Sequence, residues 1–503
     1  MTAMRRILAM LCLLVALSPA RAEDLHRPGE LIVESVSLRT PQGEMISYDR
    51  GTLYVPENRQ NPASRVIGVG FARFRAIAPT GAPPTFHLPG GPGQTFLEWL
   101  DPASPRFARL VSDIALYRRV GDMVFVDQRG FSARGDMLKF KYRTEPLPLN
   151  QPGSLAAETA AYVAMSRAAA AESSRRGVDL RGYTVKECAA DVDELRRALG
   201  YDQITLIGQS FGSQWSAAVM RLYPHSVARA ILSGVEPLDY SYDMPSHVLA
   251  AVQRQWRDAE SDPRLRPWLP DGGLAFAARE VSRRLERTPI SVTLKGDSAS
   301  KSVTVVLGVE DFRRDFLTLS DPALLLAIYH ERYEDWASEV LARRRSHDSE
   351  EILIYWSIDS SLGVTRAREY LLRNDPATQF LGEWNFDPYI ASAGIWPSDD
   401  VGDEFRAEVV NRVPILFVQG DWDVWTPMEN LLQVTPYFPN SRTLLVEHGT
   451  HAAYAEVRLL LPDTTAVIMD FLRSGRTENL PARAKVAARE WKLPNFLASS
   501  RRP

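Results

Sequence analysis

The sequence predicts an α/β protein with a mostly parallel central sheet, helices on both faces of the sheet and a large, mainly helical insertion. Short apolar runs alternate with helical patterns through the first half of the chain, which is typical of a parallel sheet covered on both faces. A mostly helical block follows at about residues 238–406, and an apolar run at 414–419 then resumes the strand pattern. A chain of 503 residues is long enough for one large core and an inserted unit.

The amino terminus has the pattern of a secretory signal. Arg5 and Arg6 precede an apolar run at 7–17, and residues 20–22 form a small-x-small cleavage site, so we expect residues 1–22 to be removed. The run is too short to span a bilayer, and we expect no stable membrane span. These features predict export to a bacterial periplasm, with secretion beyond it as the alternative.

The composition of the exported chain argues against a nucleic-acid-binding protein and against a fold held by intrachain disulfides. Removing three arginines with the signal takes the formal net charge from −3 to −6, and no basic block suited to nucleic acid remains. Cys188 is the one cysteine left, so an intrachain disulfide cannot form. It lies on the apolar side of a helical pattern, which predicts a small core residue.

The predicted sheet elements follow one another along the chain. Residues 29–56 alternate apolar and polar residues about a turn at 41–43, which predicts a leading antiparallel hairpin. A helix is predicted over 184–199, with Gly200 ending it. Further strands are predicted at residues 65–76, 85–88, 122–126, 204–209, 227–232, 414–419 and 442–446.

The change of pattern after residue 237 gives the predicted domain organisation. Within the helical block, 290–294 and 303–307 form one hairpin candidate, and Asp321 with Pro322 has the chemistry of a helix start. The predicted parts are a signal peptide at 1–22, a core with a first part at 23–237 and a second part at 409–475, a lid domain inserted at 238–408, and a tail at 476–503.

Gly208-Gln-Ser-Phe-Gly212 stands where a strand passes directly into a helix. This is the pattern of a nucleophile elbow, in which a strained turn lifts a serine hydroxyl clear of the sheet. The residues two positions away on each side must be small so that neighbouring chain segments can pass. We therefore predict that Ser210 is a nucleophile and that the Phe211 N–H points at the same reaction centre.

A serine needs a base, and the base needs a carboxylate, in the chain order Ser…Asp…His. Asp421 and Asp423 follow the predicted strand at 414–419, and we prefer Asp423 with Asp421 as the alternative. His448 and His451 follow the last predicted strand. We prefer His451, because Gly449 frees the loop to carry it over the serine, with His448 as the alternative.

The oxyanion of an acyl-transfer intermediate needs two backbone donors. The Phe211 N–H is one, and the second should come from the loop Pro89-Gly-Gly-Pro-Gly93. Because proline has no N–H, we choose Gly91, followed by Gly90. Asp127 and Arg129 end a nearby strand, and we expect a structural role for them, as an Asp–Arg pair or as hydrogen bonds that brace this loop.

Together these motifs resemble the serine aminopeptidase group of α/β-hydrolases, which includes prolyl aminopeptidases and exported tripeptidyl-aminopeptidase-like proteins. The resemblance implies an α/β-hydrolase fold with a lid, and the chain departs from the family pattern at Pro89 and Ala452 and in lacking lid cysteines. The resemblance rests on five segments: Leu88-Pro-Gly-Gly-Pro-Gly93, Asp127-Gln-Arg-Gly130, Gly208-Gln-Ser-Phe-Gly212, Gly420-Asp-Trp-Asp-Val-Trp-Thr-Pro427 and Gly449-Thr-His451. A further segment, Val55-Pro-Glu-Asn-Arg59, resembles the exported branch of the group more closely.

The leading hypothesis is an exported serine hydrolase that releases N-terminal residues from small peptides through Ser210, His451 and Asp423. Its substrate ammonium would need acidic lid residues, for which Glu236, Glu310, Asp359 and Glu383 are candidates. We expect no cofactor and no metal, because the histidines show no H-E-x-x-H spacing. The alternatives are a hydrolase of small carboxylic esters and a catalytically silent binding protein that keeps the fold; the oligomeric state is left open.

Overall fold

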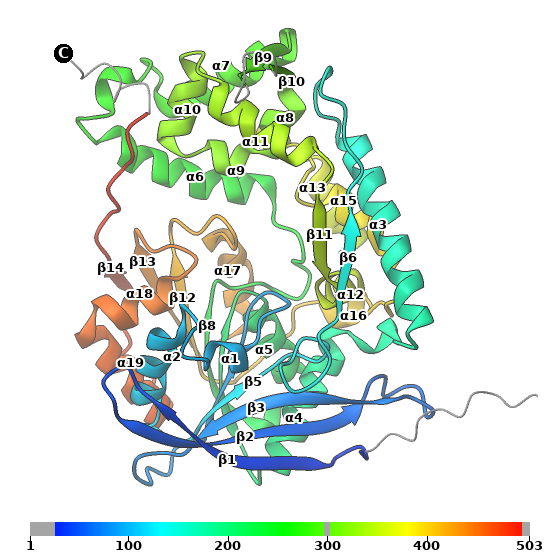
Figure 1. The fold of residues 1–503 in the computed structure, drawn as a ribbon. Coiled ribbons are helices and arrows are strands. Elements are labelled where there is room, and N and C mark those ends of the chain that lie inside the picture. The colour runs from blue at the N-terminus through cyan, green and yellow to red at the C-terminus, as the bar shows by residue number, and fades with distance from the viewer. Residues whose placement is uncertain (1–25, 296–301, 495–503) are drawn as a thin grey trace, which may run out of the picture.

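The computed structural model describes residues 26–295 and 302–494, so the predicted signal at 1–22 lies outside the described residues. A ten-stranded sheet forms the lower half of the molecule in Figure 1, and a largely helical part lies above it. The α/β architecture with a mostly parallel sheet and a large helical insertion, predicted from the sequence, is confirmed. Among the described residues, no helix is both long and apolar enough to cross a bilayer.

The sheet has the strand order β1-β2-β3-β5-β4-β7-β8-β12-β13-β14. Pairing is antiparallel from β1 to β5, as the leading hairpin requires, and parallel from β5 to β14. The strands are β1 (Leu31–Arg39), β2 (Met45–Pro56), β3 (Val66–Phe74), β4 (Thr85–Leu88), β5 (Met123–Val126), β7 (Ile204–Gln209), β8 (Val227–Ser233), β12 (Ile415–Gly420), β13 (Ser441–Glu447) and β14 (Arg483–Lys485).

Alternate side chains of each strand pack on opposite faces of the sheet. Val124 and Val126 of β5 join the core beneath α4 and α5, whereas Met123 and Phe125 join the core beneath α2 and α19. The core helices are α1 (Phe96–Trp99), α2 (Phe107–Tyr117), α4 (Val185–Ala198), α5 (Phe211–Leu222), α17 (Met428–Val434), α18 (Ala453–Leu460) and α19 (Pro462–Ser474). Cys188 of α4 is a free, fully buried core residue, as predicted.

The helical part has a hydrophobic core of its own, built mainly from α6 to α11 and α14. The predicted hairpin is present as β9 (Ile290–Leu294) and β10 (Val303–Leu307). The helices are α6 (Pro245–Glu260), α7 (Gly273–Arg287), α8 (Val309–Arg314), α9 (Phe316–Leu319), α10 (Pro322–Tyr329), α11 (Glu334–Arg344), α12 (Leu353–Leu362), α13 (Arg366–Arg373), α14 (Thr378–Leu381), α15 (Asp387–Ala393) and α16 (Asp403–Arg406).

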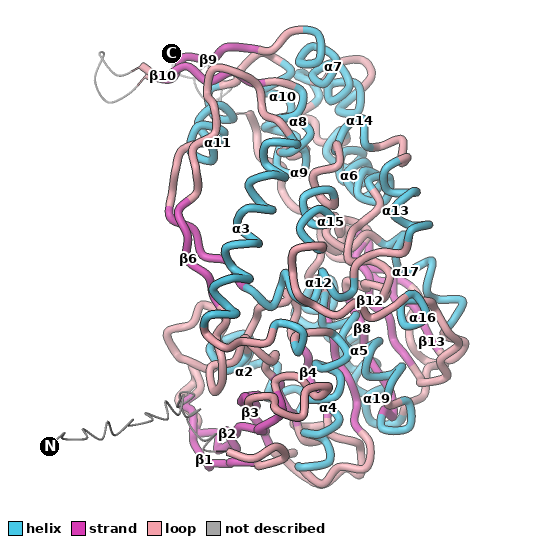
Figure 2. The backbone as a smooth tube through the Cα atoms, turned by 90° about the vertical axis from the view of Figure 1, so that its right-hand side faces the viewer, coloured by secondary structure: helices cyan, strands magenta, loops and turns pink. Residues whose placement is uncertain are grey.

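Two segments outside residues 238–408 also contact this helical part. The strand β6 (Lys139–Arg143) pairs with β11 (Asp348–Ile352), and α3 (Leu155–Arg175) runs beside β6 and packs against α15 (Figure 2). The tail adds β14 to the sheet edge, and the Trp491 ring lies 5.5 Å from the Trp422 ring in the core of the helical part. The chain therefore joins the two parts at several points.

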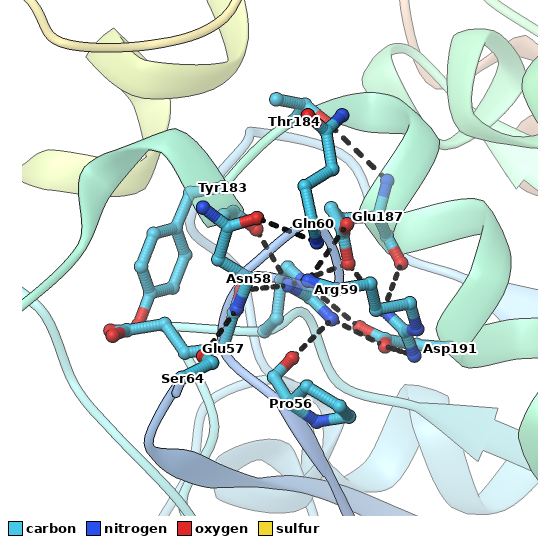
Figure 3. A network of polar contacts seen from close by, with 12 residues as sticks. Pro56, Glu57, Asn58, Arg59, Gln60, Ser64, Tyr183, Thr184, Glu187 and Asp191 are labelled. Carbon is cyan, nitrogen blue, oxygen red and sulfur yellow. Dashed lines mark hydrogen bonds and ion pairs between the residues drawn. The ribbon is translucent and has the colours of Figure 1, made fainter. Parts of the chain in front are cut away.

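A buried charge network fixes α4 to the sheet (Figure 3). The guanidinium of Arg129, which is fully buried, donates to both carboxylate oxygens of Asp191 at 2.7 and 2.6 Å. Arg59 also pairs with Asp191, at 2.6 Å, and with Glu187. Burial would raise the pKa of Asp191, but the positive charges of Arg129 and Arg59 hold it below its usual value. The possible Asp127–Arg129 pair is therefore wrong, because Arg129 points to α4 instead.

We predict that Arg129→Met lowers the free energy of unfolding by about 3–5 kcal/mol, because it leaves the buried Asp191 carboxylate without its main partner. Chemical denaturation monitored by circular dichroism would measure the change. Arg143→Met is the matched control, since Arg143 pairs with Asp348 where both side chains are largely exposed, and its loss should cost less than about 1 kcal/mol. Equal losses in both variants would contradict a structural role for the network.

Candidate active site

Ser210 lies at the sharp turn between β7 and α5, with φ 57° and ψ −132°. Its N–H donates to the carbonyl oxygens of Ser233 and Gly234 at the end of β8. A Cβ atom on Gly208 would lie 2.1 Å from the Gly212 oxygen, and one on Gly212 would lie 2.4 Å from the Leu88 oxygen. Both glycines are therefore required by close backbone contacts, as the elbow pattern predicts.

His451 and Asp423 are in direct contact. The Nδ1 atom of His451 lies 3.0 and 3.1 Å from the two carboxylate oxygens of Asp423. Asp423 is 1% exposed and follows β12, and it accepts further hydrogen bonds from the N–H groups of Trp425 and Thr426 and from the Thr426 hydroxyl. These donors fix the carboxylate, and the carboxylate fixes the tautomer and orientation of the imidazole.

Asp421 and His448, the two alternatives, contact each other instead. The backbone N–H of His448 donates to the Asp421 carboxylate at 2.7 Å, and its Nδ1 lies 3.1 Å from the Val486 oxygen beside β14. The structure thus brings the preferred pair, Asp423 and His451, into the arrangement expected of an acid and a base.

The environment of His451 favours its protonated form. Burial alone would lower the pKa of His451, but the hydrogen bond and negative charge of Asp423, together with the charge of Asp243, raise it above its usual value. A base with such a pKa takes a proton from a serine readily, yet it is neutral and able to do so only at pH values above that pKa.

Ser210 and His451 line the same cavity, which has a volume of about 330 Å³. The His451 ring packs on Gly234, where a Cβ atom would lie 2.9 Å from the ring carbon Cε1. Gly234 follows β8 and also accepts the hydrogen bond from the Ser210 N–H, so one glycine contacts both residues. The Ser210 hydroxyl itself donates to the Glu236 carboxyl at 3.2 Å.

The loop from Pro89 to Gly93 packs directly against the serine. A Cβ atom on Gly90 would lie 3.4 Å from the Ser210 Cβ, and Gly90 and Gly91 both line the cavity. The Gly93 N–H is already used, because it donates to the Gln128 side chain at 2.6 Å. Gly90 and Gly91 are therefore placed to offer N–H groups near Ser210, and the Phe211 N–H opens α5 at the same point.

Gln128 positions this loop, a role that was not predicted from the sequence. Its amide oxygen accepts from the Gly93 N–H, and its amide nitrogen donates to the Gly90 oxygen at 2.8 Å. Asp127, beside it, accepts from the Thr95 hydroxyl at 2.6 Å and from the Phe96 N–H at 3.0 Å, at the start of α1. Burial raises the pKa of Asp127 to about 7 despite these hydrogen bonds. Asp127 thus holds the segment that follows the loop, as a structural residue.

Two further glutamines, at the ends of β7 and β12, play comparable parts. Gln209 donates to the His451 oxygen at 2.7 Å. Gln419 accepts from the Val235 N–H and donates to the Thr426 oxygen and the Asp423 carboxylate. The sequence could have indicated both roles, because Gln209 and Gln419 stand at the carboxyl ends of parallel strands. Such strand ends meet at one edge of the sheet.

Three carboxyl groups from separate parts of the chain interact near the nucleophile: Glu236 after β8, which accepts from the Ser210 hydroxyl, and Asp243 before α6 and Asp359 in α12, whose charges act on Glu236. Burial, followed by the charges of Asp243 and Asp359, raises the pKa of Glu236 well above its usual value. Burial likewise raises the pKa of Asp243 to about 7 and that of Asp359 to about 7. Asp243 was missed from the sequence, since nothing local marks it.

The other two candidates for the ammonium site, Glu310 and Glu383, lie elsewhere. Glu310 pairs with Arg313 at 2.6 Å and accepts from the Trp384 indole N–H, and Glu383 pairs with Arg373 at 2.7 Å. Both expectations are corrected on this ground, because each carboxylate already has a cationic partner.

Two family models match the sequence. Residues 150–269 match a model described as the alpha/beta hydrolase fold, and residues 386–482 match one described as TAP-like protein. The second match contains β12, β13, Asp423 and His451. A comparison with curated proteins finds no match.

Several solved structures are distantly similar to this chain. A thermophilic esterase from Thermogutta terrifontis is 14% identical, with 88% of this chain and 100% of that chain covered and a TM-score of 0.34. Epoxide hydrolase A from Mycobacterium thermoresistibile is 14% identical, with 88% and 99% covered and a TM-score of 0.34. An esterase from Exiguobacterium antarcticum is 12% identical, with 84% and 99% covered and a TM-score of 0.33. At these values the likeness carries no argument about substrate.

The family models and the sheet together define the class of protein. The chain has the α/β-hydrolase fold, and its residues 150–269 are similar to the superfamily that the motifs around Ser210 indicated. Within that superfamily, its carboxyl-terminal part is similar to the TAP-like proteins.

We predict that Gln128→Leu lowers kcat for an activated acyl ester by up to about 100-fold, because the Pro89–Gly93 loop loses both hydrogen bonds that position it against Ser210. Steady-state kinetics with a nitrophenyl ester would measure this. Gln128→Glu is the informative control, since it keeps the acceptor for the Gly93 N–H and loses the donor to Gly90, so its defect should be intermediate. Wild-type kcat in the leucine variant would refute the positioning role.

Proposed function

We propose that the protein is an exported serine aminopeptidase that releases N-terminal residues from small peptides. The observation that carries the proposal is the contact of the Ser210 hydroxyl with Glu236, on which the charges of two further buried carboxyls, Asp243 and Asp359, act. A hydrolase of neutral acyl esters has no use for several buried acidic groups at its nucleophile. An ammonium group at the amino terminus of a peptide is a ligand that such carboxyls would bind.

In the proposed reaction, Ser210, His451 and Asp423 act as nucleophile, base and orienting carboxylate. The Ser210 oxygen attacks the carbonyl carbon of the scissile bond while its proton passes to Nε2 of His451. The carbonyl oxygen becomes an oxyanion that accepts hydrogen bonds from the Phe211 and Gly91 N–H groups, with Gly90 as the alternative donor. Asp423 stabilises the imidazolium that forms.

The intermediate then collapses to an acyl-enzyme. The carbon–nitrogen bond breaks, and the proton on His451 passes to the leaving amine, which departs as a shortened peptide. A water molecule gives a proton to His451 and attacks the acyl carbon. When this second intermediate breaks down, the Ser210 oxygen regains the proton and the N-terminal residue or short peptide leaves as a carboxylic acid.

The ammonium of the substrate would also change the contacts of the nucleophile. Without substrate, the Ser210 hydroxyl donates to Glu236. An ammonium bound by Glu236 would compete for the same oxygen and release the hydroxyl to His451. Substrates that lack a free amine would lose both the binding contact and this release.

The test of the proposed function compares a peptide or aminoacyl amide that has a free amine with its N-acetylated form, in wild type and in Ser210→Ala. We expect efficient hydrolysis of the free amine, a drop of at least about tenfold on acetylation, and a loss of kcat of at least about 10⁴-fold in Ser210→Ala. Hydrolysis of esters with no dependence on the amine would replace the aminopeptidase by an ester hydrolase. Failure of a fluorophosphonate to label Ser210 would favour a silent binding protein.

Glu236→Gln should lower kcat/KM for the free-amine substrate by about 10- to 100-fold, because a hydrogen bond to a charged group is lost, while the N-acetylated form changes little. Since the pKa of Glu236 is raised and those of Asp243 and Asp359 are about 7, the carboxyls gain charge as pH rises. KM for the free amine should therefore fall between about pH 6 and pH 8 in wild type.

Glu310→Gln is the matched control, because the same change is made at a carboxylate that pairs with Arg313 away from the cavity. It should leave both substrates and the pH dependence of KM unchanged. Equal losses for free and acetylated substrates in Glu236→Gln would remove Glu236 from ammonium recognition.

A further inference from the structure

The cavity at Ser210 reaches α2 and α18. Its walls include the loop at Gly90, the residues Ser210 and His451, and then side chains of these two helices. Glu236, Asp243 and Asp359 are not among the described residues that line it. With a volume of about 330 Å³, it lies at the lower end of the range for small-ligand pockets, so it suits a group the size of a short peptide fragment.

The far wall of the cavity is positively charged. Arg106, Arg109 and Arg458 line it, and Asp113 is its one acidic residue among those described. Asp113 is already used, since its carboxylate accepts from Arg458 at 3.1 Å. In the described part of the chain, Arg106 contacts the face of Trp99, with its guanidinium carbon 4.3 Å from the ring centroid, and neither it nor Arg109 forms an ion pair.

Two buried nitrogens in this wall have no hydrogen-bond partner in the described residues: Nε of Arg458 and Nδ1 of His87. The Arg458 side chain is only 5% exposed. Burial, followed by the positive charges of Arg458 and Arg109, lowers the pKa of His87 to about 3. The Arg458 guanidinium is already bound to Asp113, so the groups left to bind an anion at this wall are its buried Nε and the exposed guanidinium groups of Arg106 and Arg109.

We propose that this cavity receives the leaving-group side of the substrate and binds a carboxylate there through Arg109 and Arg106. The inference rests on the proposed function, because an ammonium at the three carboxyls places the acyl part on one side of Ser210 and the leaving amine on the other. The carboxylate is then the free C-terminus of a short peptide. The preferred substrates are thus zwitterionic peptides of a few residues, held at both ends.

The experiment compares trialanine with its C-terminal amide, each also in an N-acetylated form, in wild type and in Arg109→Ala. We expect wild type to prefer the acid over the amide by about tenfold in kcat/KM. Arg109→Ala should remove most of this preference by lowering kcat/KM for the acid, with less than about a twofold change for the amide. Arg109→Lys should restore part of it, and 0.5 M salt should weaken it.

Arg119→Ala is the matched control, because Arg119 is exposed just after α2 and does not line the cavity; it should behave as wild type. Equal rates for acid and amide in wild type, or an Arg109→Ala defect of equal size for both, would overturn the inference. Equal rates for the free and acetylated series would instead overturn the proposed aminopeptidase. In that case, the ratio of kcat/KM for the acid to kcat/KM for the amide within the acetylated series still decides whether the cavity selects an anion. The same comparison can be made with esters of glycolate and of glycolamide.

Discussion

The site depends on one contact, between the imidazole of His451 and the buried carboxylate of Asp423. A carboxylate that is 1% exposed is costly unless its oxygens are hydrogen-bonded, and the backbone of the Asp423–Thr426 turn supplies those bonds. The contact also sets the position of the ring, which then packs on Gly234 at the end of β8. Because the Ser210 N–H bonds to the same glycine, the geometry of the base and that of the nucleophile are fixed by one short piece of backbone.

The site contains acidic and basic side chains in two separate groups. Carboxyls with raised pKa values lie on the side of Glu236, whereas arginines line the cavity on the side of α2 and α18. Burial and mutual repulsion disfavour charge on the three carboxyls, so their charged forms are most stable when a cationic ligand is present. An enzyme for short peptides would use both groups, because such peptides carry an ammonium and a carboxylate only a few residues apart.

Much of this arrangement could be predicted from the sequence, because the decisive signals are local. The elbow at Ser210 is specified by two glycines within five residues, and the chain order of Asp423 and His451 follows from strand order. The choice between Asp423 and Asp421 could not be derived, since both follow the same strand and only the packed loops show which carboxylate meets a histidine. Asp243, Arg106 and Arg109 carry no local pattern that marks a site.

Other expectations failed because the charged group binds a partner other than the expected one. Arg129 is two residues from Asp127, but its guanidinium reaches Asp191 of α4, where it also binds two backbone oxygens. Glu310 and Glu383 have the right chemistry for an ammonium, yet arginines of the helical part neutralise them. Composition gives no means of distinguishing such paired carboxylates from those, like Glu236, that are left near the nucleophile.

The central claim is that His451, held by Asp423, is the base for Ser210. The most direct measurement is the pH dependence of the rate at which a fluorophosphonate labels Ser210, because it requires no knowledge of the substrate. Burial lowers the pKa of His451 but Asp423 and Asp243 raise it further, so the rate should rise with pH to a plateau with a midpoint above 6.5, and both the rate and its pH dependence should be lost in His451→Ala. Labelling of the His451→Ala variant at the wild-type rate, or a midpoint below 6.5, would contradict the account.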